Sequence, residues 1–152
     1  MPFSQLTAGR TVEILLVEDN PGDARLMREA FKESGLVGNL HVARDGEQAL
    51  AFLRQEGAYV NSPRPAFILL DLNLPGMHGS EVLAHVKANE SLRQIPVFIL
   101  STSTRSEDIN AAYHLHANCY IPKPVDLGRL LEIGKIIESF WLGTVALPRC
   151  ST

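Results

Sequence analysis

The chain has 152 residues and a mass of 16.7 kDa, which suits a single domain with a sizeable core. Its formal charge of -3 gives no electrostatic reason to expect nucleic acid, no apolar run approaches the roughly 18–20 residues of a membrane span, and the first ten residues lack the features of a secretory signal. Two cysteines are too few for a disulfide framework or a zinc site, so we expect a protein of the reducing cytoplasm. From the charge and the short apolar runs, we expect no nucleic-acid or membrane partner.

Residues 11–17, TVEILLV, form a β-branched apolar run that predicts a first strand. Helix signals follow directly, because Asn20 suits a cap and Pro21 suits the first turn of a helix. Apolar residues then recur at helical spacing until Gly35. The chain therefore begins with a strand followed by a helix.

The same alternation continues to the end of the chain. The run at 66–70 has no polar alternation, so both faces of this strand should be buried. The stretch at 57–65, GAYVNSPRP, has the composition of a loop. The expected strands cover residues 11–17, 38–43, 66–70, 97–101 and 118–121, and the expected helices cover residues 21–35, 45–53, 80–86, 105–115 and 126–142.

Five strand–helix pairs predict an α/β fold, a doubly wound (βα)5 sandwich on a five-stranded parallel sheet. We expect this domain to span residues 12–142, between tails at 1–11 and 143–152. In such sheets the ligand site lies beyond the carboxyl ends of the strands. The residues that follow each strand are therefore where chemistry is expected.

Three carboxylates, a hydroxyl and an ammonium group lie at the ends of four strands. Glu18 and Asp19 follow the first strand, Asp71 follows the third, Ser101 ends the fourth and Lys123 follows the fifth. Carboxylates packed together repel each other unless a cation is present, and hard oxygen ligands select Mg²⁺. Because a carboxylate is also a recognised nucleophile, the pattern predicts an aspartate that receives a phosphoryl group beside bound Mg²⁺.

Each of these residues has a simpler interpretation when it is taken alone. The acidic pair is typical of a helix N-terminus, Asp71 of a turn, Ser101 of a helix cap and Lys123 of a solvated loop. Four strand ends that each supply the required residue type favour the functional interpretation. The sequence has no Walker loop and no GxGxxG motif, which disfavours nucleotide binding.

The motifs VEDN, DLNLPGMHG and KP, with a hydroxyl residue after the fourth strand, resemble the receiver domain of two-component response regulators, which has the CheY-like, flavodoxin-like fold. The resemblance implies a phosphoacceptor signalling protein rather than an enzyme. The segments VEDNPGDARLMREAF, GAYVNSPRP, LHANCYI and ESFWL are most similar to the small stand-alone response regulators of cyanobacterial phytochromes. This similarity implies a light-sensing histidine kinase as the phosphoryl donor.

The resemblance also implies a role for each site residue. Asp71 is the expected phosphoacceptor, and it binds Mg²⁺ together with Glu18, Asp19 and the backbone carbonyl of Asn73. These four residues are the expected metal site.

The same resemblance implies how the phosphoryl group is contacted and how the signal passes on. Ser101, Lys123 and the backbones of Asn73 and Thr102 are expected to contact the phosphoryl group. Ser101 and Tyr120 are the expected switch, because in similar proteins the hydroxyl moves toward the phosphate and the aromatic ring turns inward.

Three further features concern the loops around this site. The Lys123–Pro124 peptide bond is cis in similar proteins. His116 stands where the family usually has glycine; if that position closes the fourth helix in a left-handed turn, histidine is less suited to it than glycine. His78 is expected to be a surface loop residue, and a metal role for His114 and His116 is disfavoured.

Other functions remain open at this point. An aspartate-nucleophile phosphohydrolase of the haloacid-dehalogenase kind also uses Mg²⁺, Asp and Lys, but it has a second aspartate where this chain has Asn73, and it has a cap domain. A receiver that has lost phosphorylation is disfavoured because every expected site residue is present. A stand-alone receiver that serves another histidine kinase, or a phosphorelay intermediate, is a further alternative.

The last expected helix carries two apolar stripes. A stripe suited to the core consists of Leu127, Leu130, Ile137 and Trp141. The other stripe, which a monomeric amphipathic helix does not need, consists of Ile133, Ile136 and Phe140. The chain ends about ten residues later, so we expect no output domain, and we predict a homodimer through the fourth helix, fifth strand and last helix. The alternative is that the flanking tails cover this stripe.

Overall fold

Five parallel strands form one sheet in the computed structural model of the chain, which describes residues 12–33, 35, 38–123, 126–142 and 146–148. The strand order is β2-β1-β3-β4-β5, and every neighbouring pair is parallel. The strands are β1 (Val12–Val17), β2 (Gly38–Ala43), β3 (Phe67–Leu70), β4 (Val97–Ser101) and β5 (Cys119–Pro122). This order confirms the predicted doubly wound fold.

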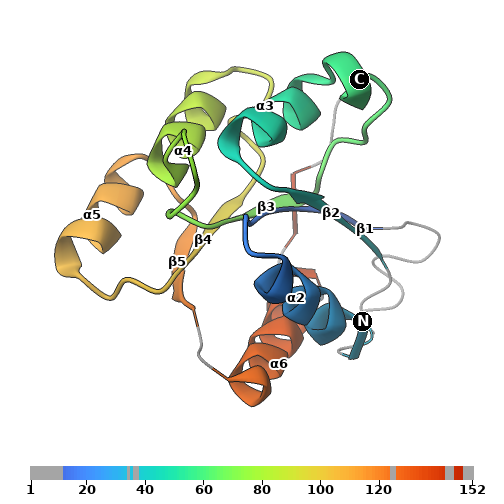
Figure 1. Ribbon diagram of the computed structural model, residues 1–152, viewed down its shortest axis with the longest axis vertical. Helices are drawn as coiled ribbons and strands as arrows, with labels where there is room; N and C mark the ends of the chain where they lie inside the picture. The colour runs from blue at the N-terminus through green and yellow to red at the C-terminus, as the bar shows by residue number, and fades with distance from the viewer. Residues whose placement is uncertain (1–11, 34, 36–37, 124–125, 143–145, 149–152) are drawn as a thin grey trace.

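Helices cover both faces of the sheet. Figure 1 shows α2 and α6 together on one face, and α3, α4 and α5 on the other. The helices are α2 (Pro21–Glu33), α3 (Gly46–Arg54), α4 (Gly79–Ala88), α5 (Ser106–His114) and α6 (Leu127–Ile136), with a 3₁₀ turn η1 (Gly57–Tyr59) and a π-helical segment η2 (Ile137–Leu142).

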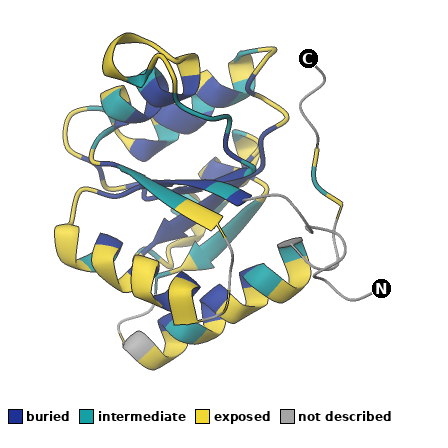
Figure 2. Ribbon diagram, turned by 90° about the vertical axis from the view of Figure 1, so that its right-hand side faces the viewer, coloured by how far each residue is buried: buried dark blue, intermediate teal, exposed yellow. Residues whose placement is uncertain are grey.

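The core consists of two apolar layers that the sheet separates. Figure 2 shows buried residues along the strands and on the inner sides of the helices, with exposed residues on the outer sides. All four residues of β3 are buried, as expected for a central strand that is covered on both faces. Burying aliphatic and aromatic side chains on both sides is the main stabilising contribution to such a fold.

The last helix differs from the expectation in two ways. It is α-helical only to Ile136 and continues as the π-helical η2, in which Trp141 lies 4.4 Å from Phe98 between ring centroids. Ile133, predicted to lie on an exposed stripe, is 6% exposed and belongs to the core. The physical reason is helical spacing, because Ile133 lies three residues after Leu130 and four before Ile137, which are both buried.

Ile136 and Phe140 are exposed as predicted, with 52% and 50% of their surface accessible. The predicted tails at 1–11 and most of 143–152, and the Lys123–Pro124 peptide bond, lie outside the described residues. No helix within the described ranges is long and apolar enough to cross a lipid bilayer.

Candidate phosphoacceptor site

Strand pairing brings two acidic residues together at the carboxyl edge of the sheet. Val17 at the end of β1 is in register with Leu70 at the end of β3. The next residue on each strand, Glu18 and Asp71, is therefore placed at the same edge. The Asp71 N–H donates a hydrogen bond to the Val17 carbonyl at 3.1 Å, which extends the pairing by one residue.

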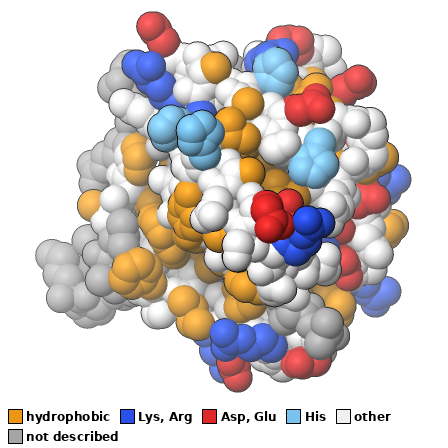
Figure 3. All heavy atoms as spheres, turned by 90° about the vertical axis from the view of Figure 1, so that its left-hand side faces the viewer, with side chains coloured by type: hydrophobic (Ala, Val, Ile, Leu, Met, Phe, Trp, Pro, Cys, Tyr) orange, Lys and Arg blue, Asp and Glu red, His pale blue; other side chains and the backbone are white. Residues whose placement is uncertain are grey.

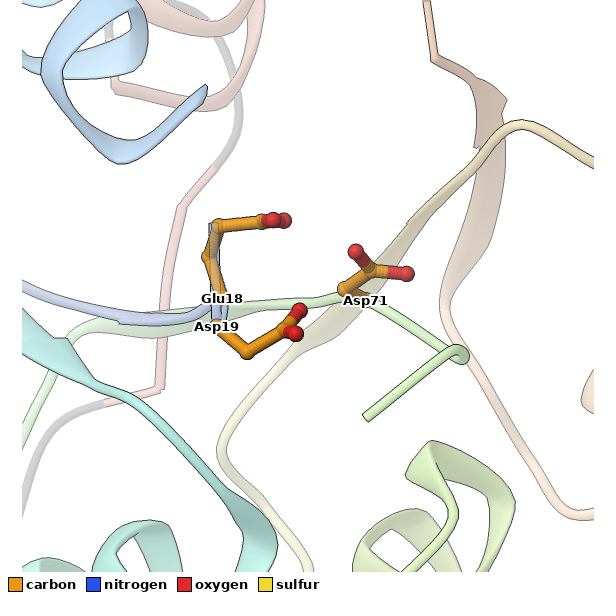
Figure 4. Close-up of side chains that lie close together, drawn as sticks. All are labelled: Glu18, Asp19 and Asp71. Carbon is orange, nitrogen blue, oxygen red and sulfur yellow. The ribbon is translucent and has the colours of Figure 1, made fainter. Parts of the chain in front are cut away.

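Three carboxylates converge at this edge, as Figure 4 shows. One oxygen each of Glu18, Asp19 and Asp71 lies within 4.8 Å of the others. Glu18 and Asp71 are 3% and 6% exposed, whereas Asp19 is exposed to solvent. Oxygen ligands of this kind suit a hard divalent cation, and a group that is open on one side leaves room for water or phosphate oxygens as further ligands. The residues therefore fit a metal ion.

Lys123 reaches the same carboxylates from β5. Its backbone N–H donates to the carbonyl of Ser101 at 2.6 Å, which fixes the start of the side chain beside β4. Its Nζ lies 2.8 Å from Glu18 Oε2, 2.8 Å from Asp23 Oδ2 and 3.3 Å from Asp71 Oδ2. An ammonium group has three N–H donors, so each donor has a carboxylate acceptor.

The electrostatics of the site follow from burial and crowding. Burial, with the hydrogen bond and charge of Asp71, raises the pKa of Glu18 to about 7, although Lys123 opposes the shift. Burial acts to lower the pKa of Lys123, but the hydrogen bonds of Asp23 and Glu18 and the charges of Asp71 and Glu18 outweigh it and raise that pKa. Without a metal ion, the pocket therefore favours a charged lysine, and Glu18 is only partly ionised near pH 7.

The loop after β3 holds Asp71 in place. The backbone N–H of Asn73 donates to Asp71 Oδ1 at 2.9 Å, and the N–H of Gly79 donates to the Leu72 carbonyl at 2.9 Å. A side chain at Gly79 would meet the Asp71 carbonyl oxygen at 2.3 Å, so helix α4 can start this close to β3 only with glycine. His78 is exposed, as expected for a loop residue, and its ring also caps α4 by accepting from the Ser80 N–H at 3.1 Å.

Ser101 and Tyr120 both bond to Ser103 in the loop after β4. Ser101 is fully buried, and its Oγ accepts the Ser103 N–H at 3.2 Å. The Tyr120 hydroxyl donates to the Ser103 carbonyl at 2.8 Å, and its ring packs against the core. Among the described residues no hydrogen bond joins Ser101 to Asp71, and Thr102 is exposed.

Two residues of this site were missed by the sequence analysis. Asp23 was interpreted as a charge that stabilises the first turn of its helix, but its carboxylate also pairs with Lys123. The sequence carries no local signal for this contact, because the rotation of α2 that turns the Asp23 carboxylate toward Lys123 depends on packing. Ser103 carries no signal either, because its role depends on its backbone groups.

Comparisons with known proteins agree with this geometry. Residues 14–135 match the family described as response regulator receiver domain. The chain is 53% identical over 135 residues to response regulator Rcp1 of Synechocystis, covering 89% of this chain and 92% of that protein. The crystal structure of the Mn²⁺-bound form of Rcp1 matches with a TM-score of 0.84 at 51% identity, over 91% of this chain and 99% of that one. The crystal structure of the phosphorylated cyanobacterial phytochrome response regulator RcpA matches with a TM-score of 0.87 at 50% identity, with the same two coverages.

Proposed function

The chain belongs to the response regulator receiver family, and from that premise we propose that it accepts a phosphoryl group on Asp71 from a sensor histidine kinase. The observation that carries the proposal is the position of Asp71. Its carboxylate ends the central strand, beside two further carboxylates and within 3.3 Å of the Lys123 ammonium group. Glu18 also belongs to the acidic group and contacts Lys123, but it follows β1, whereas Asp71 follows β3 at the centre of the sheet.

The transfer is a substitution at phosphorus. An Asp71 carboxylate oxygen forms a bond to the phosphorus, the bond between phosphorus and the donor's histidine nitrogen breaks, and the electron pair stays on that nitrogen. The product is an acyl phosphate on Asp71. Lys123 is positioned to offset negative charge on the transferred oxygens, and its raised pKa keeps it protonated.

We assign the metal site to Glu18, Asp19, Asp71 and the backbone carbonyl of Asn73, with Mg²⁺ as the physiological ion. A bound divalent cation supplies neutralisation of the phosphoryl oxygens during transfer. The Mn²⁺-bound form of Rcp1, a relative at 51% identity, supports the assignment of a divalent cation. The backbone N–H of Asn73 and that of Thr102 are assigned to the phosphoryl oxygens, and Ser101 to a hydroxyl contact with them.

The same proposal extends to the switch and to the donor. Ser101 and Tyr120 share Ser103 as a hydrogen-bond partner, which gives a physical connection between the phosphoryl site and β5. Relatives named as phytochrome response regulators support a phytochrome-type, light-sensing kinase as the donor. A receiver that serves another histidine kinase, or a relay intermediate, is the second candidate, because every site residue above serves all three roles equally.

The experiment that tests the proposal is labelling with acetyl phosphate and Mg²⁺, followed by mass spectrometry of the intact protein. We expect a gain of one phosphoryl group that is absent in Asp71→Asn. Glu47→Gln makes the same carboxylate-to-amide change on an exposed helical position and should label normally. Absence of label on the wild-type protein contradicts the proposal, and rapid turnover of varied phosphoesters would instead favour a phosphohydrolase.

We also propose a homodimer through the surface formed by α5, β5 and α6. Ile136 and Phe140 are exposed there, beside a groove of about 550 Å³ that Cys119, Ile121 and Trp141 help to line. Figure 3 shows hydrophobic side chains gathered on the side of the molecule where α5 and β5 lie. Exposed apolar side chains next to an apolar groove are typical of an interaction surface.

A further inference from the structure

Asp23 is a partner of the active-site lysine that lies on a helix rather than at a strand end. Its Oδ2 is 2.8 Å from Lys123 Nζ, as close as Glu18 and closer than Asp71 at 3.3 Å. Its backbone N–H bonds to the Asn20 side chain, so the first turn of α2 holds its position. The Asp23 side chain is 40% exposed, whereas those of Glu18 and Asp71 are 3% and 8% exposed.

We propose that Asp23 is a positioning residue that holds the Lys123 ammonium group on the α2 side of the site and so competes with a phosphoryl group on Asp71 for that lysine. The inference rests on the proposed phosphoacceptor function and adds a residue that sets how strongly the phosphorylated state is held.

The competition follows from the donors of the ammonium group. All three N–H bonds of Lys123 already have acceptors, and two of these, on Glu18 and Asp23, are nearer than Asp71. A phosphoryl group on Asp71 brings additional negative oxygens, and a donor that turns toward them must leave an acceptor that it now has. Asp23 is the acceptor most easily replaced, because solvent reaches it and can satisfy it in place of the lysine.

Space beside the lysine permits this exchange. A cavity of about 70 Å³ lies between α2, the sheet and the start of α6, and Glu18, Asp23 and Lys123 are among the residues that line it. A cavity of this size accommodates water molecules at a site with polar groups. Asp23 lines this cavity and Asp71 does not, so the space lies on the Asp23 side of the ammonium group, where water can bond to the Asp23 carboxylate when the lysine turns toward Asp71.

The experiment uses beryllium fluoride with Mg²⁺ as a phosphoryl mimic on the full-length protein, with binding measured by ¹⁹F NMR. We expect Asp23→Asn to tighten binding about three- to tenfold, as expected for release of one partly exposed charge-assisted hydrogen bond. Asp23→Glu restores the carboxylate and should remain near the wild-type affinity.

A double-mutant cycle separates competition for the lysine from a general effect of charge. In the Lys123→Ala background, Asp23→Asn should produce less than half of its effect in the wild-type background. The ¹⁵N resonance of the Lys123 ammonium group should also shift in Asp23→Asn without added ligand, a readout that binding does not influence.

Weaker or unchanged binding of the mimic in Asp23→Asn overturns the inference, and so does an equal effect with and without Lys123. These results leave the proposed function intact as long as wild-type Asp71 is labelled by acetyl phosphate. Failure of that labelling rejects the proposed function, and the inference with it. Urea unfolding of each variant measures its stability and so shows whether a loss of affinity for the mimic is due to unfolding of the variant.

Discussion

Glu18 is a buried carboxyl group whose environment raises its pKa. Its pKa rises from 4.5 to about 7, chiefly because of burial and then because of Asp71. A folded protein that binds a proton more tightly than the unfolded chain loses stability as pH rises between the two pKa values. This contribution of Glu18 to stability is therefore fully present below pH 4.5 and is lost by about pH 7.

Glu18→Gln should remove that loss. In metal-free buffer we expect the variant to be more stable than the wild type at pH 7.5, by up to about 3 kcal/mol, and to differ little at pH 5. Urea unfolding at the two pH values with a chelator measures the difference. Equal effects of the substitution at both pH values would contradict the assigned cause. Asp71, which raises the pKa of Glu18, remains unchanged in this comparison.

His116 follows α5 in the left-handed region, with φ of 71°, which is the conformation in which histidine is less suited than glycine. Because a side chain there crowds its own backbone, His116→Gly should stabilise the protein by about 0.5–1 kcal/mol after the entropy lost by glycine is deducted. The same substitution at His85, an exposed position in the interior of α4, should destabilise by a similar amount. Thermal or urea unfolding of the pair tests the expectation, and stabilisation by both would refute it.

At the scale of residues, the sequence predicted those site members that follow strands. The carboxyl ends of parallel strands share one edge, so Glu18, Asp19, Asp71 and Lys123 could be placed together without a structure. Asp23 could not be placed, because the rotation of α2 relative to the edge depends on packing. Ser103 could not be predicted for another reason. Its backbone N–H and C=O make the contacts with Ser101 and Tyr120, and every residue except proline has both groups.

At the scale of elements, the start of α4 lies very close to the end of β3. A Cβ at Gly79 would lie 2.3 Å from the Asp71 carbonyl oxygen and 2.6 Å from the Leu72 Cα. Both contacts are with backbone, so the helix start or the strand end must move to accept a methyl group. The position of the proposed phosphoacceptor therefore depends on a glycine eight residues later.

Gly79→Ala should destabilise the protein by about 1–3 kcal/mol and reduce labelling of Asp71 by acetyl phosphate. Gly76→Ala is the matched control in the same loop, because a Cβ there meets nothing within 4 Å and only its φ of 72° causes strain. We expect that control to lose about 1 kcal/mol and to keep its labelling. Normal labelling of a folded Gly79→Ala protein would show that Asp71 does not need this close approach.

Element boundaries were predicted well wherever a strong local signal ends an element. Residues 38–43 form β2 as expected, and Asp45 caps α3 through the Gln48 N–H. The last helix was predicted less well, because the change to π-helical geometry at Ile137 has no local sequence signal. The prediction for Ile133 was wrong because the buried face of the helix is wider than the predicted stripe. That face includes Ile133 as well as Leu130 and Ile137, at spacings of three and four residues.

At the scale of the whole molecule, the surface beside α6 determines the expected state of association. Replacing Ile136 and Phe140 together by glutamine should convert a dimer into a monomer in sedimentation, because both side chains are half exposed in the single chain. Val60→Gln is the control, since Val60 is 61% exposed but lies in the loop between α3 and β3. An unchanged mass for the double variant would reject this surface as the dimer interface.

The contacts of Lys123 with Glu18 and Asp71 have a consequence for how the protein folds. Glu18 and Lys123 are 105 residues apart in sequence, and Lys123 and Asp71 are 52 apart, so the site forms only when three distant segments of the chain meet. Contacts between residues that are far apart in sequence form slowly, because the chain loses the entropy of closing a large loop before the contact can stabilise it. A cation that needs all three carboxylates cannot help the early steps of that search. We expect the cation to lower the rate of unfolding, because it binds only the native site. The rate of folding should remain nearly unchanged.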